Sequence, residues 1–344
     1  MTVLERNPGI GREITSRNSE VVHAGIYYPP GSLKATLCCE GRERLYARCI
    51  RLSLPHRRLG KWIVAGDAGE VPALEVLLER GRANGVPGLR LVEGASLRRS
   101  EPQVAVVAAL ESPETGIVDG AALCLSLAAE LEALEGVIAL RTEVVGIERR
   151  THGYRLVCVG DDGERGELDC GAVVNAAGLA GDRVAALAGL DVDALGYRIR
   201  PCKGDYFALT PGAPVRLSRL VYPLPSGPGL GIHATLDLAG RIRFGPDAEF
   251  VDAPRYDVDP SKARAFASAI RCYLPSVRAE WLTPDQAGVR PRLAGPGEAS
   301  ADFVLAEESE AGLPGFVDLI GIESPGLTAA LAIGERVARL LAAV

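Results

Sequence analysis

The segment that decides the fold is IGIESPGLT, residues 320–328, which runs directly into a stretch rich in Ala, Leu and Ile. Its two glycines let the backbone approach a flat ligand closely, and Ser324 and Thr328 flank a helix start. The first N–H groups of a helix have no partner within the helix and carry the positive end of its dipole. The segment therefore predicts a helix entrance that faces a negatively charged, ring-shaped group. An ordinary Ser-Pro-Gly helix start is the alternative.

The amino-terminal residues 2–6 read as a short buried strand that ends with Glu5 and Arg6 and is followed by an Asn-Pro-Gly turn. In a dinucleotide-binding unit, the second strand ends in an acid that accepts hydrogen bonds from the adenosine ribose, about 20 residues after a glycine-rich turn. Counting back from Glu5 places that turn before Met1. We therefore expect the first strand, the phosphate-binding glycines and the first helix to be missing from this chain. A strand of some other sheet is the alternative.

Composition limits the classes of protein that this chain can represent. It has 344 residues, of which 47% are apolar and 24% charged, and this is enough for two domains with substantial cores. The net charge of −6 argues against nucleic acid as a partner. The most apolar stretch, 327–341, contains three charged residues and is not expected to cross a bilayer. Because charges and a proline come early, no secretory signal is expected at the amino terminus.

The eight cysteines show none of the paired spacings that hold zinc or an iron–sulfur cluster, so no metal site is expected. We predict that these cysteines are reduced and mostly buried, in a cytoplasmic protein. Periodicity and turn residues predict helices at 32–51, 72–84, 120–134 and 262–273 and strands at 57–65, 137–148, 154–159, 173–175 and, in short pieces, 197–250.

This order of elements predicts an α/β chain in which two domains interleave. A Rossmann-like dinucleotide-binding domain, truncated at its amino terminus, is expected to comprise 1–53, 118–196 and 287–344. A mixed-sheet α+β substrate domain is expected to comprise 54–117 and 197–286. The first domain would hold the cofactor, and the second would form one wall of the substrate site.

Several segments, in this order along the chain, resemble those of one known family. They are RNSEVVHAGIYYPPGSLK (17–34), LPHRRLGK (54–61), VNAAG (174–178), GIH (231–233), FGPDA (244–248), GVRPRL (288–293) and SPGLT (324–328). Together they resemble the FAD-dependent L-2-hydroxyglutarate dehydrogenases, within the wider D-amino-acid-oxidase-like (DAO) flavoproteins. Two departures from the family pattern are the missing glycine motif and Lys203, in PCKGDYF, where we expect an Arg.

The resemblance implies FAD as the cofactor. The loop 15–19, rich in hydroxyl, amide and guanidinium donors, suits the pyrophosphate and ribityl chain; a solvated loop is the alternative. The strand end 175–178 has small residues that let a ligand approach closely; a plain strand-to-helix turn is the alternative. The implied cofactor residues are Glu5, Arg6, Thr15, Ser16, Arg17, Asn18, Ser19, Val144, Asn175, Ala176, Ala177, Gly178, Gly321, Ser324, Pro325, Gly326, Leu327 and Thr328.

The implied chemistry is oxidation of an alcohol carbon beside a carboxylate, in which a base removes the hydroxyl proton and a hydride passes to the flavin. Histidine titrates near neutrality and is the natural base. His233 is favoured as the base, and His23 as a group that orients the substrate or flavin. His152 is expected in a solvated turn. For His56, two roles stay as alternatives: a structural hydrogen bond and a place in the site.

A dicarboxylate substrate needs cations and hydroxyl donors at both ends. The expected cations are Arg290 and Lys203, although Lys in place of Arg loosens carboxylate geometry. The expected phenolic donors are Tyr27, Tyr28, Tyr206 and Tyr222.

The sequence therefore predicts FAD-dependent oxidation of L-2-hydroxyglutarate, or a close 2-hydroxy acid, to 2-oxoglutarate. A quinone, another carrier or oxygen would accept the electrons, and peripheral contact with a membrane stays open. The alternatives are an amine or amino-acid oxidase, a glycerol-3-phosphate dehydrogenase relative, and a truncated, inactive remnant. Because the pyrophosphate-binding glycines are missing, we expect this chain alone to hold FAD poorly.

Overall fold

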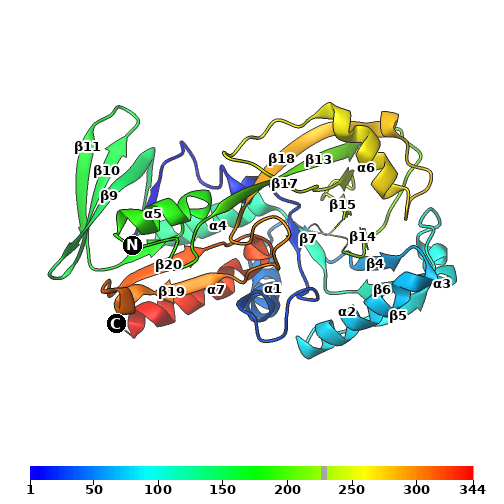
Figure 1. Cartoon of the computed structure of the whole chain (residues 1–344), viewed down its shortest axis with the longest axis horizontal. Coiled ribbons are helices and arrows are strands. Elements are labelled where there is room, and N and C mark those ends of the chain that lie inside the picture. The colour runs from blue at the N-terminus through cyan, green and yellow to red at the C-terminus, as the bar shows by residue number, and fades with distance from the viewer. Residues whose placement is uncertain (226–230, 344) are drawn as a thin grey trace.

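The computed structural model describes residues 1–225 and 231–343. Two long helices, α1 (Leu33–Leu52) and α7 (Gly326–Ala342), lie at the centre of an elongated molecule (Figure 1). A large sheet lies on one side of them, and several small sheets lie on the other. The remaining helices are α2 (Val71–Ala83), α3 (Gly94–Ser100), α4 (Gly120–Ala133), α5 (Gly181–Leu187) and α6 (Ala263–Ile270).

The large sheet has nine strands and mixes parallel and antiparallel pairs, as expected for a mixed-sheet unit. Its backbone order is β17-β13-β16-β15-β14-β4-β6-β5, and β18 pairs with β13. The strands are β4 (Lys61–Ala65), β5 (Arg90–Glu93), β6 (Ala108–Ser112), β13 (Arg200–Leu209), β14 (Leu220–Pro223), β15 (Ala234–Leu236), β16 (Ile242–Phe244), β17 (Glu249–Phe250) and β18 (Leu282–Arg292).

The two faces of this sheet are covered differently. Trp62 and Val64 of β4 pack with Phe266 of α6 in one core, whereas Ile63 and Ala65 pack with α2 in another. Because successive side chains of a strand point to opposite faces, Lys61 lies on the same face as Ile63. This face also carries the candidate site described below.

Three of the four small sheets hold only segments expected to form the dinucleotide-binding domain, whereas the fourth, β2-β7-β3, also contains segments expected in the substrate domain. Strand β1 (Thr2–Glu5) pairs in parallel with β8 (Val137–Leu140), and β12 (Val173–Asn175) pairs in parallel with β20 (Phe316–Ile320). Within the described residues, β1 and β12 each have one strand partner, so no single sheet joins them. The other strands are β2 (Val21–Val22), β3 (His56–Arg57), β7 (Gly116–Val118), β9 (Thr142–Arg150), β10 (Gly153–Gly160), β11 (Arg165–Cys170) and β19 (Val304–Glu307).

Two sequence expectations differ from the structure. The predicted strand 137–148 is divided at Arg141, which has a left-handed φ of 55°, so that β8 joins β1 while β9 pairs with β10. The expected domain boundary at residue 287 falls inside the continuous strand β18. The division into two domains otherwise stays a prediction.

Fewer cysteines are buried than the sequence predicted, since only half of them are. All eight cysteines are free; Cys38, Cys49, Cys158 and Cys202 are buried, and Cys272 is exposed. Across the described residues, no helix combines the length and apolar character that a bilayer crossing requires.

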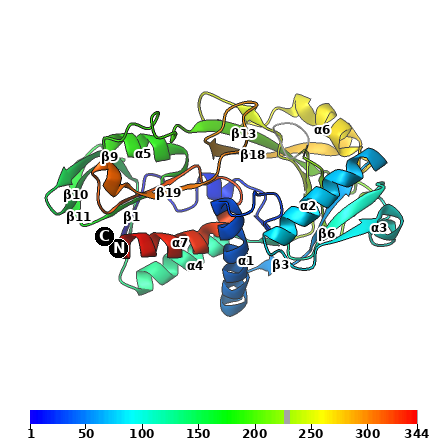
Figure 2. The ribbon, with the colours of Figure 1, turned by 60° about the horizontal axis from the view of Figure 1, so that its bottom comes forward.

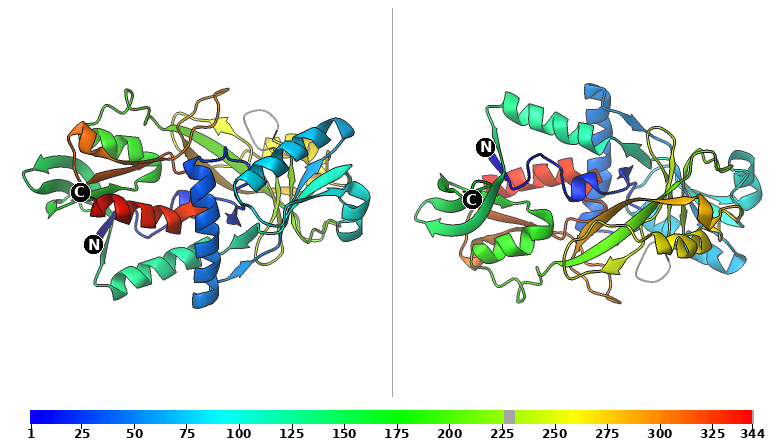
Figure 3. Two further views of the ribbon diagram at one scale, coloured as in Figure 1. Left: turned by 90° about the horizontal axis from the view of Figure 1, so that it is seen from below. Right: turned by 90° about the horizontal axis from the view of Figure 1, so that it is seen from above.

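Helices α1 and α7 cross in close contact (Figures 2 and 3). Helix α1 is capped by Ser32, whose Oγ accepts a hydrogen bond from the Ala35 N–H, and Asp302 accepts hydrogen bonds from the N–H groups of Leu33 and Lys34. At the crossing, a Cβ added to Gly41 would lie 2.7 Å from the Cα of Ala329 and closer still to the Thr328 carbonyl oxygen. The absence of a side chain at Gly41 therefore sets how closely α7 approaches.

We predict that Gly41→Ala destabilises the protein by about 1–3 kcal/mol, because the new methyl group forces the two helices apart. Gly334→Ala is the matched control, since Gly334 is an exposed glycine of α7 whose added Cβ meets nothing within 4 Å. The control should stabilise by about 0.5–1 kcal/mol. Urea denaturation monitored by circular dichroism measures both changes, and equal stability of the two variants would contradict the prediction.

Candidate active site

Side chains from neighbouring strands of the large sheet converge on the face that carries Lys61. Tyr222 of β14 lies beside β4, where it is paired with Ile63, and His233 directly precedes β15. Tyr206 comes from β13, and Arg290 of β18 is paired with Cys202 of β13. The structure therefore brings together His233, Tyr206, Tyr222 and Arg290, which the sequence predicted for the site.

Aromatic rings organise the centre of this group. The rings of Tyr222 and His233 stack with centroids 3.5 Å apart and an interplanar angle of 9°. Lys61 Nζ lies 4.6 Å from the ring centroid of Tyr222 and also 4.6 Å from that of Tyr27. The Tyr27 hydroxyl is buried and has no hydrogen-bond partner among the described residues. It is therefore a polar group available to a ligand.

His23 lies between this group and the start of α7. Its Nε2 is 3.2 Å from Ser324 Oγ, and its backbone N–H donates to Thr328 Oγ1 at 3.0 Å. Thr328 Oγ1 donates in turn to the Val21 carbonyl at 3.3 Å. These contacts join residues about 300 positions apart in the chain. They fix the imidazole of His23 against the helix entrance.

The segment that carries His23, Tyr27 and Tyr28 is held from behind by helices α1 and α2. Arg42 of α1 donates to the Ala24 carbonyl at 2.9 Å. The Asn84 amide, at the end of α2, donates to the carbonyls of Gly25 at 2.8 Å and Tyr28 at 2.9 Å. Gly25 has a φ of 100°, and an added Cβ would lie 2.7 Å from Cys39 Sγ. The site is thus held by main-chain contacts to two packed helices.

Two basic side chains, Lys61 and Arg290, dominate the electrostatics of the site. Burial lowers the pKa of Lys61 to about 7. Burial, together with the nearby charges of Lys61 and Arg290, lowers the pKa of His23 to about 3, so that its imidazole is neutral near pH 7. Among the described residues, no carboxylate forms an ion pair with Lys61 or Arg290. Burial also raises the pKa of Tyr206 and Tyr222, which keeps both as neutral donors.

The start of α7 fits the ring end of a flavin. Its N-cap residue, Pro325, provides no side-chain cap, so the first N–H groups of a 17-residue helix have no hydroxyl or carboxylate cap. Gly321 has a φ of 69° and lies against Leu293. Ser324 is exposed, and its Oγ lies 3.2 Å from His23 Nε2. An uncapped helix start next to an exposed hydroxyl suits an anionic ring, whereas Thr328 is buried and structural.

The residues predicted for the nucleotide end are mostly engaged with one another. Glu5 accepts two hydrogen bonds of 2.8 Å from Asn7, and Arg6 pairs with Glu13. Asn18 donates to the Ile14 and Thr15 carbonyls, and Ser16 donates to the Glu13 carbonyl.

Two residues of the same loop contact the substrate side of the molecule. Arg17 stacks over the Tyr256 ring at 4.3 Å, and Ser19 is 3.0 Å from the Tyr206 hydroxyl. This loop therefore links the expected nucleotide end to the candidate site. Its role toward FAD stays a prediction.

Asn175 has a structural role at the end of β12. Its amide donates to the Gly181 carbonyl at 2.8 Å and to Asp318 Oδ1 at 2.6 Å. Burial raises the pKa of Asp318 to about 7, against the opposing effect of this hydrogen bond. The following residues, Ala176, Ala177 and Gly178, form the turn into α5, and Gly178 has a φ of 56°. Val144 is half-buried in β9.

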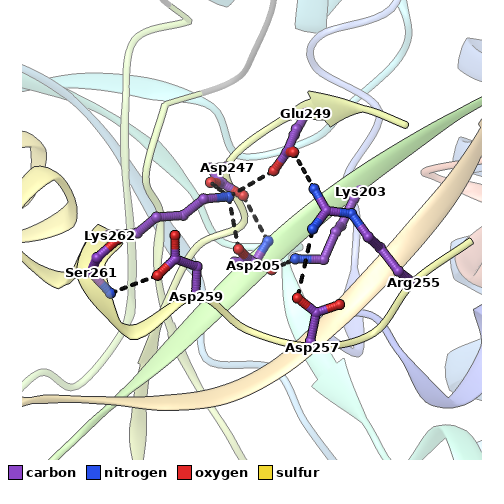
Figure 4. A network of polar contacts seen from close by, with 9 residues as sticks. All are labelled: Lys203, Asp205, Asp247, Glu249, Arg255, Asp257, Asp259, Ser261 and Lys262. Carbon is purple, nitrogen blue, oxygen red and sulfur yellow. Dashed lines mark hydrogen bonds and ion pairs between the residues drawn. The ribbon is translucent and has the colours of Figure 1, made fainter. Parts of the chain in front are cut away.

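Lys203 does not join the candidate site, which corrects the sequence prediction. It is 1% exposed, and its ammonium pairs with Asp205, which also accepts from Lys262 Nζ at 2.8 Å (Figure 4). Lys262 further contacts Asp247 at 2.9 Å and Glu249 at 3.0 Å. Lys203 and Tyr206 are three residues apart in one strand, so their side chains point to opposite faces. The charge of Lys203 is therefore balanced on the far face of β13.

Sequence reasoning missed Lys61, which opens β4 at 1% exposure. The available signal was a charged residue directly before the apolar run WIVA. This residue is the first of a strand that is buried along its whole length. His56 Nδ1 lies 2.8 Å from the Leu54 carbonyl, which is a structural contact. His152 is exposed in the turn between β9 and β10, as expected.

Comparisons with known proteins agree with this geometry. The family model described as FAD dependent oxidoreductase, DAO, matches residues 1–340. A dithionite-reduced L-alpha-glycerophosphate oxidase from Mycoplasma pneumoniae with FAD bound superposes with a TM-score of 0.86 at 27% identity, covering 99% of this chain and 88% of that one. A glycine oxidase from Geobacillus kaustophilus gives a TM-score of 0.81 at 19% identity, with 99% and 87% covered. The chain belongs to the FAD-dependent oxidoreductase family, and its cofactor is FAD.

Within this family, the chain is similar to proteins named L-2-hydroxyglutarate dehydrogenase. The protein from Arabidopsis thaliana is 38% identical over 98% of this chain and 77% of its own length. The human protein is 38% identical over 72% of this chain and 54% of its own length. The protein from the bacterium Indibacter alkaliphilus is 29% identical over 98% of this chain and 91% of its own length. The chain thus spans about half of the human relative and most of the other two.

The burial of Lys61 generates a stability prediction with a defined sign. The unfolded chain holds the lysine proton up to its usual pKa near 10.5, whereas the folded protein releases it at about 7. The unfolded state therefore binds more protons between these pH values. Lys61 lowers the free energy of unfolding most below pH 7. The penalty disappears as the pH rises toward 10.

We predict that Lys61→Met raises the free energy of unfolding at pH 6 and that this gain shrinks steadily toward pH 10. Urea denaturation of both proteins across this pH range measures the difference, in which groups common to both cancel. A gain that is independent of pH would contradict the prediction.

Proposed function

We propose that this protein oxidises L-2-hydroxyglutarate, or a close 2-hydroxy acid, to 2-oxoglutarate. The observation that carries the proposal is a pair of basic side chains, Lys61 and Arg290, that have no carboxylate partner among the described residues and lie beside two histidines and three tyrosines at an uncapped helix start. Such a group of side chains attracts an acid that bears hydroxyl groups. The similarity to the L-2-hydroxyglutarate dehydrogenases supports the same substrate.

FAD supplies the hydride acceptor when it is bound at the start of α7. In the reaction, the C2–H bond of the substrate breaks as a hydride, the hydroxyl proton leaves to a base, and a C2=O bond forms. We assign the base role to His233, which is held flat against Tyr222. His23, with a pKa lowered to about 3, is a poor base and orients substrate or flavin through Ser324.

The substrate carboxylates are assigned to the cations, and the tyrosine hydroxyls are assigned to hydrogen bonds with substrate oxygens. Arg290 is half-buried and close enough to His23, Tyr206 and Tyr222 to influence the pKa of each. Tyr27 offers a hydroxyl that has no hydrogen-bond partner among the residues the structure describes. The anion that binds Arg290 partly neutralises the charge that depresses the pKa of His23.

The proposal is tested by anaerobic reduction of the FAD-loaded protein, followed through flavin absorbance. L-2-hydroxyglutarate should bleach the flavin and yield 2-oxoglutarate, identified by mass spectrometry. The D-enantiomer, glycerol 3-phosphate, glycine and L-amino acids are the comparison substrates. Faster bleaching by glycerol phosphate or an amino acid would overturn the proposal in favour of that activity.

We predict that Arg290→Met lowers kcat/KM for L-2-hydroxyglutarate about 10- to 100-fold, because charge-assisted hydrogen bonds contribute about 1.5–3 kcal/mol. Arg278→Met, which changes a 66%-exposed arginine beside Trp281, should leave kcat/KM unchanged. Steady-state kinetics with an artificial electron acceptor measures both. Equal values for wild type and Arg290→Met would contradict the carboxylate-binding role.

The electron acceptor is proposed to be a quinone, another carrier or oxygen, and oxygen consumption by the reduced protein separates the last from the others. A cytoplasmic location stays a prediction. The plant and human relatives carry the word mitochondrial in their names, whereas the bacterial relative does not.

A further inference from the structure

Two buried lysines of the large sheet have opposite surroundings. Both Lys61 and Lys203 are 1% exposed. Lys203 pairs with Asp205, which Lys262 also contacts, so its charge is balanced by a built network (Figure 4). Lys61 has no carboxylate partner within the described chain, and its ammonium contacts the faces of Tyr27 and Tyr222 at 4.6 Å.

Aromatic faces attract a cation but do not neutralise it. The quadrupole of a tyrosine ring offsets part of the cost of removing an ammonium from water, and two rings offset more. The remaining cost is that of a buried charge without a counter-ion. A counter-ion supplied by a ligand would remove that cost.

Arg290, the second basic side chain of the site, also lacks a carboxylate partner among the described residues. His23 is influenced by both Lys61 and Arg290. The acid nearest in sequence to the helix entrance, Glu323, is already engaged by Lys34 at 2.9 Å and faces Arg292 at 3.9 Å. The site therefore holds two basic side chains, Lys61 and Arg290, that no described carboxylate balances.

We propose that Lys61 determines specificity by binding one carboxylate of a dicarboxylate substrate while Arg290 binds the other. This inference rests on the proposed oxidation of a 2-hydroxy acid. It explains why the site would bind a dicarboxylate more tightly than a monocarboxylate of equal length. Charge balance requires two negative charges, and the rings of Tyr27 and Tyr222 hold the ammonium in one place.

The proposal implies a pH dependence of binding. The ammonium is needed to bind the carboxylate, and because burial lowers the pKa of Lys61 to about 7, affinity should fall as the pH rises above 7. The titratable or charged groups near Lys61 are Cys38, His23, Arg290, Tyr27, Tyr222 and His233. Burial raises the pKa of Cys38 and both tyrosines, and the pKa of His23 is about 3, so these groups keep one form between pH 6 and 9. Lys61→Arg stays charged over this range, and His233 is common to both proteins.

The experiment is calorimetric binding of glutarate and pentanoate, which share a five-carbon chain but differ by one carboxylate. Wild type should bind glutarate about 10- to 100-fold more tightly than pentanoate, as expected for charge-assisted contacts. Lys61→Met should lose this preference, with pentanoate affinity nearly unchanged. Lys61→Arg should retain most of the preference and lose its decline above pH 7.

The matched control is Lys203→Met, which makes the same change at a lysine of equal burial on the other face of the sheet. It should lower stability, because it leaves Asp205 short of a partner, but it should keep the preference for glutarate. Circular dichroism checks that each variant is folded. If Lys61→Met does not fold, the pH dependence of wild type against Lys61→Arg decides the proposal alone.

Parallel kinetics separate this inference from the proposed function. An unchanged preference for glutarate in folded Lys61→Met overturns the role of Lys61, even if the protein oxidises L-2-hydroxyglutarate. Absence of that oxidation in wild type overturns the proposed function, while loss of the glutarate preference in Lys61→Met still supports the dicarboxylate pocket.

Discussion

The structure depends on a constraint in its large sheet, where two basic side chains lie in one site and neither pairs with a carboxylate of the described residues. Lys61 lies among tyrosine rings, and Arg290 projects from the neighbouring part of the same sheet. Keeping such a charge buried opposes folding, so the surrounding contacts must over-determine its position. The same charge is what an anionic substrate recognises, so a stability cost and a binding function lie in one side chain.

The support for this pocket comes from distant parts of the chain. Helix α7 approaches α1 at Gly41, and Thr328 then binds the backbone at Val21 and His23. Helices α1 and α2 in turn hold the segment 23–28 by its carbonyl groups. The helix entrance expected to face the flavin and the histidine beside it are therefore placed by one packing arrangement. The geometry of the site follows from helix packing more than from local loop structure.

The elements that the sequence predicted well are those with strong local signals. Helix α1 begins after a Ser cap, α2 carries a Pro in its first turn, and α7 follows the Ser-Pro-Gly entrance. The break between β8 and β9 was missed, because Arg141 adopts a left-handed conformation that nothing in an alternating segment announces. The family resemblance, and with it FAD, was confirmed by the match to residues 1–340.

The site was predicted in part, and the error at Lys203 has a clear physical cause. Lys61 opens β4, whereas Lys203 lies within β13, and the prediction for Lys203 did not take the alternation of its strand into account. For Lys203 the partner is Asp205, only two residues away and therefore on the same face of the strand. Strand alternation already separates Lys203 from Tyr206. Only the register of β4 beside β14 shows that Lys61 shares a face with Tyr222.

The most direct test of this account is a crystal structure of the FAD-loaded protein with 2-oxoglutarate bound. The account predicts one carboxylate within hydrogen-bond distance of Lys61 Nζ, the other at the Arg290 guanidinium, and the 2-oxo carbon on the side of the pocket that faces the start of α7. A ligand bound away from Lys61, with that ammonium still enclosed by Tyr27 and Tyr222 alone, would contradict it.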